Sequence, residues 1–599
     1  MNEELLKYYE AELKHLRELG EEFKRAYPKV ASRLGIEREK CTDPYVERLL
    51  EGFAFLAARV RLKLDSGYSC FIQHLLDTVY PHFLRPLPSM AVVQFTPSTK
   101  EGNLDRGVPL PRGTKIFSDV GGGKCCFRTS HDVNLTPLRI ATARYRRGDG
   151  YAQTHQDVRL GAACAEVELK LQTHGAKGFE KVSFDRVTLF LPPDGEEAMQ
   201  LYECLTTAHV GTVVTIEHNG ETEHHVLQSD AIRPVGFDQS QALLPYRAES
   251  FSGYRLLQEY FAMPSRFMFV EIVGLKDIVN RCDGPDIEVK ILFERAYDEL
   301  EREVSTKNFA LHCTPAINLF DKIAKPIPVT PLPEHQVLAD TRPVEFEIYS
   351  VDRVSASRAK SKQEQEFFPL YSATRRQATP PSSAFYATRR EPKLPAVETE
   401  SRLVDYLGDE VFLSLVDSTN APYASDLETI FVETTCTSRH LPEWMIETGR
   451  TDFYVMDGQP VASVEALVGP TPPSPSRAGA GLEWAALNQL TPNFLALSDL
   501  DGEQAAGALR ELLMLYDQPG FDEARKQIEG IRAVITREIV ERIPCDGPVS
   551  FDRGVEVCIT VEKAAFAGSG HFLFGEVLAN FFSTLACPRA FMDPWQEIQ

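Results

Sequence analysis

The chain has 599 residues, a formal net charge of −22 and 43% hydrophobic residues. This is the composition of a globular protein, and the length predicts roughly three or four domains rather than one core. The acidic balance argues against a general nucleic-acid binder, which needs a broad basic face.

The first 85 residues are predicted to be helical. In the first segment the apolar side chains fall on heptad positions a and d, and Pro28 is expected to end or kink that helix. These heptad residues are Leu6, Tyr9, Leu13, Leu16, Phe23, Tyr27 and Val30. The spacing is typical of a helix that packs along one seam.

A second helix is predicted within residues 41–65. Asp43 suits an N-cap, and proline at position 44 is accepted as the first helical residue. The apolar stripe of this helix consists of Val46, Leu49, Leu50, Phe53, Leu56, Ala57, Val60 and Leu64. Such a stripe should be buried, but the sequence leaves open whether its own fold or another chain covers it. A third apolar segment at 70–84 ends at a proline-rich boundary.

The middle of the chain changes to short strands and turns. Runs such as MAVVQFTP, VELKLQT and IEVKILFER, flanked by Gly and Pro, predict one or more β-rich domains over residues 86–345. Asn219 and Gly220 predict a two-residue hairpin turn within residues 213–227.

A second β-rich region is predicted over 346–481. Within it, 355–400 is expected to form loops around a short ordered island, FFPLYS at 367–372, and 469–481 is expected to be a linker or long loop, because these segments are polar and rich in Pro and Ser. We hypothesise that these loops adapt differently in two copies of the chain. Residues 482–599 mix amphipathic helices with strands. The predicted fold class is therefore α+β multidomain: an N-terminal helical segment over 1–85, β-rich middle domains and a mixed α/β C-terminal domain.

Two short segments are similar to catalytic or phosphate-binding motifs but lack residues that those motifs require. GGGKCC at 121–126 lacks the Gly and the Ser or Thr of a phosphate-binding loop, so we expect a turn between strands. Ser569 lies near His571, but Ala567 replaces the first Gly of the G-x-S-x-G elbow of a hydrolase. We expect Ser569 to cap a helix. No catalytic residue is predicted.

Three histidines gather near the predicted hairpin. Because side chains alternate along a strand, His218 and His225 fall on one face and His224 on the other. They cannot converge on one metal ion without a bulge, and the ligand spacing of a zinc site is missing. We therefore predict surface histidines and no metal site.

Residues 251–272 are unusually rich in Phe and Tyr. One interpretation is ordinary core packing of a helix followed by a strand. The other is a docking face, since aromatic and Arg residues are enriched at interface centres. The sequence favours the first and leaves the second open.

The N-terminal blocks MNEELLKYYEAELKHLRELGEEFKRAYPKVASRLG and DPYVERLLEGFAFLAARVRLKLD resemble the TssF (VasA/ImpG) family of type VI secretion baseplate subunits. The resemblance continues in order through LLDTVYPHFLRPLPSMAVVQF, GFDQSQALLPY, FALHCTPAINLF, TCTSRHLPEWM, LNQLTPNFLALSD and FAGSGHFLFGEVLANFF. These blocks span essentially the whole chain and are highly specific together. Ser438 and His440 depart from the Asn and Asp that are usual in the family.

The resemblance implies a non-enzymatic scaffold without cofactors. It implies that two TssF-like chains and one TssG-like wedge subunit form the core of a baseplate wedge, similar to that of contractile phage tails. The wedges would surround the spike hub (VgrG), contact a gp25-like sheath initiator (TssE) and recruit a trimeric adaptor (TssK). The expected partners thus include a second copy of the chain, but no nucleic acid and no direct membrane insertion.

In such a scaffold the helical N-terminal segment would join an inter-subunit bundle. The candidate interface residues are Leu6, Tyr9, Leu13, Leu16, Phe23, Leu49, Phe53, Leu56 and Val60. No cofactor-binding or metal residue is predicted.

Localisation is predicted to be cytoplasmic, in a baseplate docked at the inner-membrane complex. The start MNEELLKYYE has no signal-peptide pattern, and no run of about 18 apolar residues predicts a membrane span. The 12 cysteines form no C-x-x-C pair, which favours reduced thiols. Two rival functions stay open: a β-domain hydrolase or carbohydrate-active enzyme, and a stand-alone protein-binding module.

Overall fold

The computed structural model describes most of the chain. The described residues are 3–33, 44–98, 104, 107–120, 123–148, 163–173, 179, 182–227, 230–246, 251–342, 345–358, 361–370, 384–393, 406, 408–416, 427–448, 452–456, 458–476, 486, 502–517, 522–543, 550–566, 570–585, 590 and 591. They fall into two compact units, 1–76 and 77–599.

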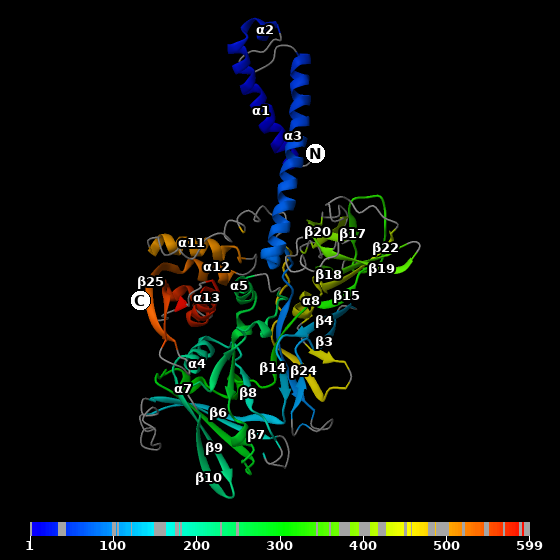
Figure 1. The fold of residues 1–599 in the computed structure, drawn as a ribbon. Coiled ribbons are helices and arrows are strands. Elements are labelled where there is room, and N and C mark those ends of the chain that lie inside the picture. The colour runs from blue at the N-terminus through cyan, green and yellow to red at the C-terminus, as the bar shows by residue number, and fades with distance from the viewer. Residues whose placement is uncertain are drawn as a thin grey trace. The chain divides into compact units, whose positions relative to one another are not determined.

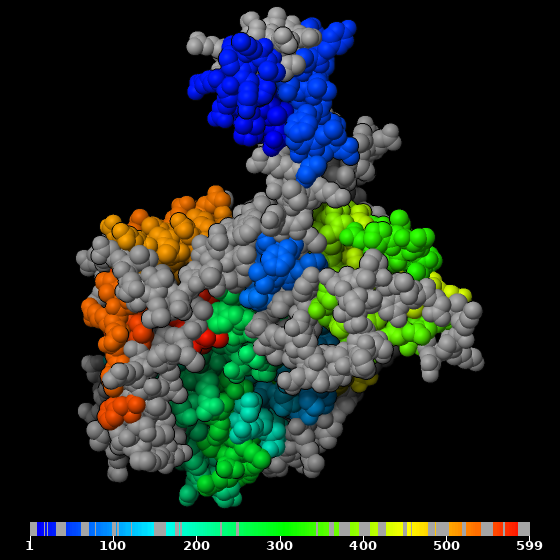
Figure 2. All heavy atoms as spheres, turned by 45° about the horizontal axis from the view of Figure 1, so that its top comes forward, coloured from blue at the N-terminus to red at the C-terminus, as the bar shows by residue number. Residues whose placement is uncertain are grey.

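The first unit is helical. It contains α1 (Glu3–Ala26), α2 (Pro28–Arg33) and most of α3 (Pro44–Val79), and α1 lies beside α3 in Figures 1 and 2. The break between Ala26 and Pro28 confirms the predicted role of that proline, whereas Asp43 lies outside the described residues.

The apolar segment at 70–84 is not a separate helix. Helix α3 runs through its first part for 36 residues in all, because no proline stands between Pro44 and Pro81 and an internal glycine costs a helix only about 1 kcal/mol. A short 3-10 turn, η1 (Pro81–Leu84), follows.

A closed six-stranded barrel lies at the centre of the second unit (Figure 1). Its strands, in spatial order, are β1 (Met90–Pro97), β14 (Cys313–Ile317), β4 (Gly123–Thr129), β3 (Lys115–Val120), β23 (Asp452–Val455) and β24 (Val461–Val468). Phe95 and Phe127 belong to its buried core, together with Leu441 and Met445 from α8 (Leu441–Thr448).

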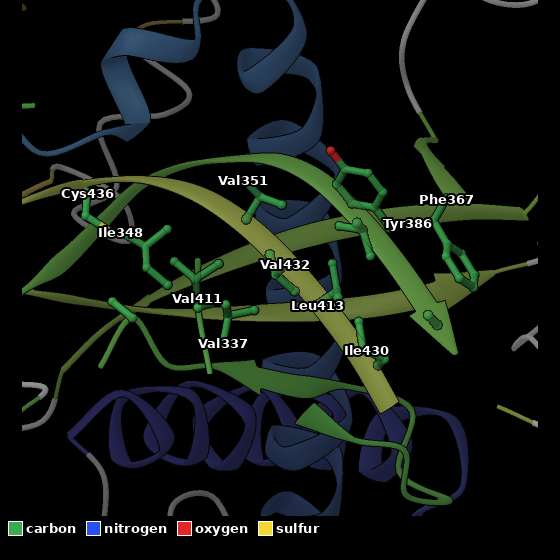
Figure 3. Close-up of a cluster of buried hydrophobic side chains, with 14 of the residues drawn as sticks. Val337, Ile348, Val351, Phe367, Tyr386, Val411, Leu413, Ile430, Val432 and Cys436 are labelled. Atoms are coloured by element: carbon green, nitrogen blue, oxygen red, sulfur yellow. The ribbon is translucent and has the colours of Figure 1, made fainter. Parts of the chain in front are cut away.

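An eight-stranded sheet is inserted in sequence between β14 and β23. Its strands follow the order β15 (Phe320–Ile323), β22 (Leu427–Thr437), β18 (Glu347–Arg358), β19 (Ser361–Pro369), β20 (Ala384–Pro392), β21 (Asp409–Val416) and β17 (His335–Val337), while β16 (Ile327–Pro328) pairs with β22. Figure 3 shows its core, in which Val351, Leu413 and Val432 point toward one another.

Four smaller sheets and several helices complete the second unit. The sheets are β10 (Glu221–Leu227), β9 (His209–His218), β13 (Asp286–Phe293), β7 (Ala165–Thr173), β6 (Leu138–Arg147); β11 (Ile232–Val235), β12 (Phe269–Val273), β8 (Arg186–Phe190); β2 (Val108–Leu110), β5 (Val133–Leu135); and β25 (Ile531–Ile543), β26 (Ser550–Val561), β27 (Ala590–Phe591). The helices are α4 (Glu196–Thr206), α5 (Ser252–Ala262), α6 (Lys276–Val279), α7 (Leu300–Glu303), α11 (Gly502–Met514), α12 (Asp522–Glu529) and α13 (His571–Leu585), with 3-10 turns at η5 (Gln239–Gln241), η6 (Pro264–Phe267), η7 (Thr306–Asn308) and η8 (Lys563–Phe566).

The α+β fold class is confirmed: helices lead, the body is rich in strands, and the C-terminal part mixes both. The predicted loop over 355–400 is wrong in part, because β19 and β20 form there and pair in parallel at Phe367 and Ala384. Pairing with the neighbouring strands β18 and β21 and with each other orders these polar segments, which composition does not reveal. The domain bounds stay predictions, although the barrel takes strands from both sides of residue 345.

Candidate interaction surface

Between Leu49 and Val60, helix α3 leaves four large apolar side chains uncovered. The exposed fractions are 73% for Leu49, 60% for Phe53, 58% for Leu56 and 60% for Val60. These four residues, spaced by four, three and four positions, lie along one face of the helix, and we call them the α3 stripe. Exposed apolar rows of this kind are typical of surfaces that bind another molecule.

The same helix buries small side chains. Ala54 and Ala58 are both 0% exposed, and a spacing of four places them one helical turn apart. In this part of the helix the burial is thus the reverse of the usual amphipathic pattern, in which large apolar residues face the chain's own core. Farther along α3, Ile72 and Leu76 are buried. Within the described residues the stripe is available for a different chain.

Helix α1 contributes fewer exposed apolar groups. Tyr9, Leu13 and Leu16 are half-buried, while Phe23 is exposed. The ring of Phe23 lies 5.4 Å from that of Tyr27. The side chain of Leu6 lies outside the described residues, so the structure places four of the five α1 candidates.

The aromatic stretch at 251–272 belongs to the core, as the favoured interpretation predicted. The ring of Tyr254 on α5 lies 4.9 Å from that of Tyr80, and the ring of Phe261 lies 5.9 Å from that of Tyr516. The ring of Tyr260 lies 5.6 Å from that of Phe574. These contacts join α5 to the residue before η1, to the segment after α11 and to α13, so the docking-face alternative does not hold for these side chains.

The charged residues of α5 are buried as well. Glu259 accepts hydrogen bonds from the backbone N–H groups of Leu243 (3.1 Å) and Leu244 (2.9 Å), and its other oxygen pairs with Arg255 (3.0 Å) and Arg266. All three charged side chains are at most 1% exposed. Burial lowers the pKa of Arg255 to about 10. We call this group the Glu259 triad.

The Glu259 triad holds the loop before α5. Arg266 Nη2 donates to the carbonyls of Gly236 (2.7 Å) and Gln241 (3.0 Å), and Arg255 Nη2 donates to that of Phe237 (3.4 Å). The charges therefore satisfy buried backbone groups, which would otherwise cost about 1–3 kcal/mol each. These contacts give the triad a structural role in positioning this loop.

The three hairpin histidines bind separate partners. The register of β9 and β10 places His218 opposite Glu221 and His225 opposite Val214, as predicted. His218 lies 3.0 Å from Asp283, and His225 lies 3.1 Å from Glu223. Among the described side chains, no group of three or more His, Cys, Asp or Glu residues could hold a metal ion.

The other motif residues that the structure describes lie in strands, in the core or in hydrogen bonds within the chain. Strand β3 ends at Val120 and β4 begins at Gly123, consistent with a turn in GGGKCC. Burial raises the pKa of the Cys125 thiol to about 12, which keeps it protonated and unreactive at neutral pH. Ser438 donates its backbone N–H to Asn318 Oδ1 at 2.7 Å. The predicted helix cap Ser569 lies outside the described residues.

Among the helices in the described part of the chain, none is both long enough and apolar enough to span a membrane.

Comparison with known proteins gives a consistent result. The family model described as "Type VI secretion system, TssF" matches residues 1–594. A protein described as type VI secretion system component TssF1, from Pseudomonas aeruginosa, is 38% identical over 601 residues, which cover 99% of this chain and 96% of that protein.

Two solved structures share the fold. One, described as the TssK-TssF-TssG baseplate subcomplex of the type VI secretion system, matches with a TM-score of 0.69 at 24% identity, over 91% of this chain and 95% of that chain. The other, described as the baseplate complex from the type VI secretion system, matches with a TM-score of 0.51 at 22% identity, over 97% and 94%. Sequence and fold together show that the chain belongs to the TssF family of the type VI secretion system.

Proposed function

We propose that this chain is a structural subunit of a type VI secretion baseplate wedge, which supports assembly of the tail tube and sheath around the spike. The α3 stripe carries the proposal, because it is a row of large apolar side chains that the described residues leave uncovered. Each such side chain contributes about 1.5–3 kcal/mol when it is fully buried, before the entropy cost of association.

We propose that the α3 stripe joins a helical bundle with a TssG-like wedge subunit and a second copy of this chain. The solved relative described as a TssK-TssF-TssG subcomplex supports the first partner and a TssK-like adaptor. A TssE-like sheath initiator and a VgrG-like spike hub are proposed on the family resemblance. The complex would lie in the cytoplasm, docked at the inner-membrane complex.

We also propose that the chain has no enzymatic activity. The family is a structural one, and the buried charged groups of the Glu259 triad hold a loop rather than line a cleft. The rival hydrolase and the stand-alone binding module have no specific observation in their favour.

Co-expression with a TssG-like partner tests the scaffold, with native mass spectrometry as the measurement. We expect a stable complex of two of these chains with one partner. Leu56→Asp should abolish that complex and leave the circular dichroism of the body unchanged, because the side chain is exposed in the single chain. Leu13→Asp and Leu16→Asp should weaken assembly too.

Arg59→Asp is the matched control, since Arg59 is exposed on the same helix but lies outside the α3 stripe. It should leave the complex intact. A well-behaved monomer that ignores the partner would overturn the proposal. Loss of all folded signal in the Leu13 and Leu16 variants would instead show that the α1 seam is internal core.

A further inference from the structure

Helix α3 has a glycine on its exposed side, next to the α3 stripe. Gly52 is exposed and lies in the interior of this 36-residue helix, where glycine is less favourable than every other residue except proline. A Cβ placed on Gly52 would meet no atom of the described residues within 4 Å, apart from the backbone of the helix itself. The described part of the chain therefore leaves room for a side chain at this position, and that space is open to another molecule.

The α3 stripe follows the repeat of a coiled coil. The spacing of four, three and four positions places Leu49 and Leu56 at heptad position d, and Phe53 and Val60 at position a. Val46 occupies the preceding position a. β-Branched residues at a with leucine at d favour two parallel strands. The partner that fits this pattern is a parallel helix with the same repeat, and a second copy of the chain supplies one.

Gly52 enlarges the space that such a pair needs for a phenylalanine. In a coiled coil, each side chain at position a enters a hole made by four residues of the facing helix. For Phe53, in two identical parallel helices in register, the hole consists of Leu49, Gly52, Phe53 and Leu56 of the other copy, at i, i+3, i+4 and i+7. We call these four residues the Gly52 hole. Because one of its four members has no side chain, the hole can admit an aromatic ring.

The charge and the buried alanines of this stretch lie away from the seam of the pair. Glu51 is the only charged residue in the sequence from 49 to 56, and it falls at position f, on the outer side of a coiled coil. Ala54 and Ala58, which are 0% exposed in the single chain, fall at positions b and f. Two copies of the helix can therefore meet along the α3 stripe without like charges facing each other there.

We propose that the α3 helices of two copies of this chain pair in parallel and in register, with Phe53 of each copy inserted into the Gly52 hole of the other. The contact is the same in both directions, as a two-fold interface requires. Gly52 determines the specificity of this pair, because a fourth side chain in the hole would overpack the ring. The inference rests on the proposed function, since it names the contact between two copies within the proposed bundle.

Photo-cross-linking of the co-expressed complex tests the pairing. The full chain carries p-benzoylphenylalanine in place of Phe53 and is purified with its TssG-like partner. Trypsin releases this position in peptide 49–59, because Arg48 and Arg59 end the two cleaved segments. We expect peptide 49–59 linked to a second peptide 49–59, which arises only between two copies because each chain has one. A link only to the TssG-like partner, or no link in an intact complex, overturns the pairing and leaves the wedge proposal standing.

Filling the Gly52 hole is a second test that uses only natural residues. Gly52→Leu should lower the affinity between the two copies about tenfold in native mass spectrometry, because overpacking destabilises a close contact. The melting temperature of the single chain should not fall, since leucine favours a helix more than glycine does. The double variant Gly52→Leu, Phe53→Ala should recover part of the affinity, because the smaller side chain needs less space.

Arg48→Leu is the matched control, because it adds the same side chain to an exposed position of the same helix outside the Gly52 hole. It should leave the complex intact. An unchanged affinity in Gly52→Leu overturns the pairing, and so does an equal loss in Arg48→Leu. If the unmodified chain forms no complex that holds two copies, the wedge proposal fails and the pairing fails with it.

Discussion

Helices α3 and α5 both carry rows of large apolar residues, but the row on α5 is buried and the α3 stripe is exposed. In α5 even the charged Arg255 and Glu259 are buried, and each side of the helix contacts a different part of the second unit. In α3 the alanines are buried and Leu49 and Phe53 are exposed. Periodicity identifies an amphipathic helix but not its partner. The buried charges of α5 have buried partners, whereas α3 has an uncovered apolar row.

Removing the carboxylate of the Glu259 triad should have the largest effect. Glu259→Ala leaves Arg255 and Arg266 buried without their counter-charge and frees the N–H groups of Leu243 and Leu244. The loss should be about 3–5 kcal/mol, measured by urea denaturation or as loss of soluble protein. Glu221→Ala, at an exposed position, is the control. Equal stability of the two variants would contradict a buried triad.

A pair of leucine substitutions compares the two helices directly. Leu257→Ala on α5, where the side chain is 0% exposed, should lower the free energy of unfolding by about 2–5 kcal/mol. Leu49→Ala on α3 should change it by less than about 0.5 kcal/mol and should weaken the complex instead. The measurements are urea denaturation of the single chain and native mass spectrometry of the complex. A stability loss in Leu49→Ala equal to that in Leu257→Ala would mean that the chain itself covers the α3 stripe.

The stability of the turn at Gly236, whose carbonyl accepts a hydrogen bond from Arg266, should be sensitive to one added methyl group. Gly236 has a φ of +117°, and a Cβ there would lie 3.2 Å from the Arg266 carbonyl oxygen. Gly236→Ala should therefore cost about 1–3 kcal/mol through backbone strain. Gly220→Ala is the control at another positive φ, because no atom lies within 4 Å of its Cβ position. It should cost less, since only the strain remains.

The smallest expected effect is a dependence of stability on pH. Glu576 on α13 accepts a hydrogen bond from Tyr202 at 2.9 Å, and burial raises its pKa to about 7. Because the pKa of Glu576 is higher in the folded state than in the unfolded state, protonation of this carboxyl stabilises the fold. This stabilisation is complete below about pH 4.5 and is lost as the pH rises to about 7. Glu576→Gln keeps an acceptor for Tyr202 and should raise the stability at pH 8 by about 1 kcal/mol, with no gain at pH 4. A gain of equal size at both pH values would rule out ionisation as the cause.

Local patterns predicted the local parts of this fold. The Asn219-Gly220 turn, the break at Pro28 and the start of α3 at Pro44 follow from backbone preferences of single residues. The strands β19 and β20 were missed, because pairing across the sheet orders them. Composition reports only how a segment behaves alone.

The candidate interaction surface was also predictable only in part from the sequence. The α3 stripe was predicted residue by residue from helical spacing, but its exposure depends on what the rest of the chain covers.

The closure of the barrel sets an early limit on when the body of this protein can begin to take its final fold. Phe95 of β1 lies opposite Val464 of β24, so one edge of β1 has no partner until nearly four-fifths of the chain has been made. At about 5–20 residues per second, that interval lasts roughly 20–70 s. An unpaired apolar strand is a template for aggregation during this time. The α3 stripe leaves the ribosome long before the barrel closes, so a partner that binds it early would meet a chain whose body is still incomplete.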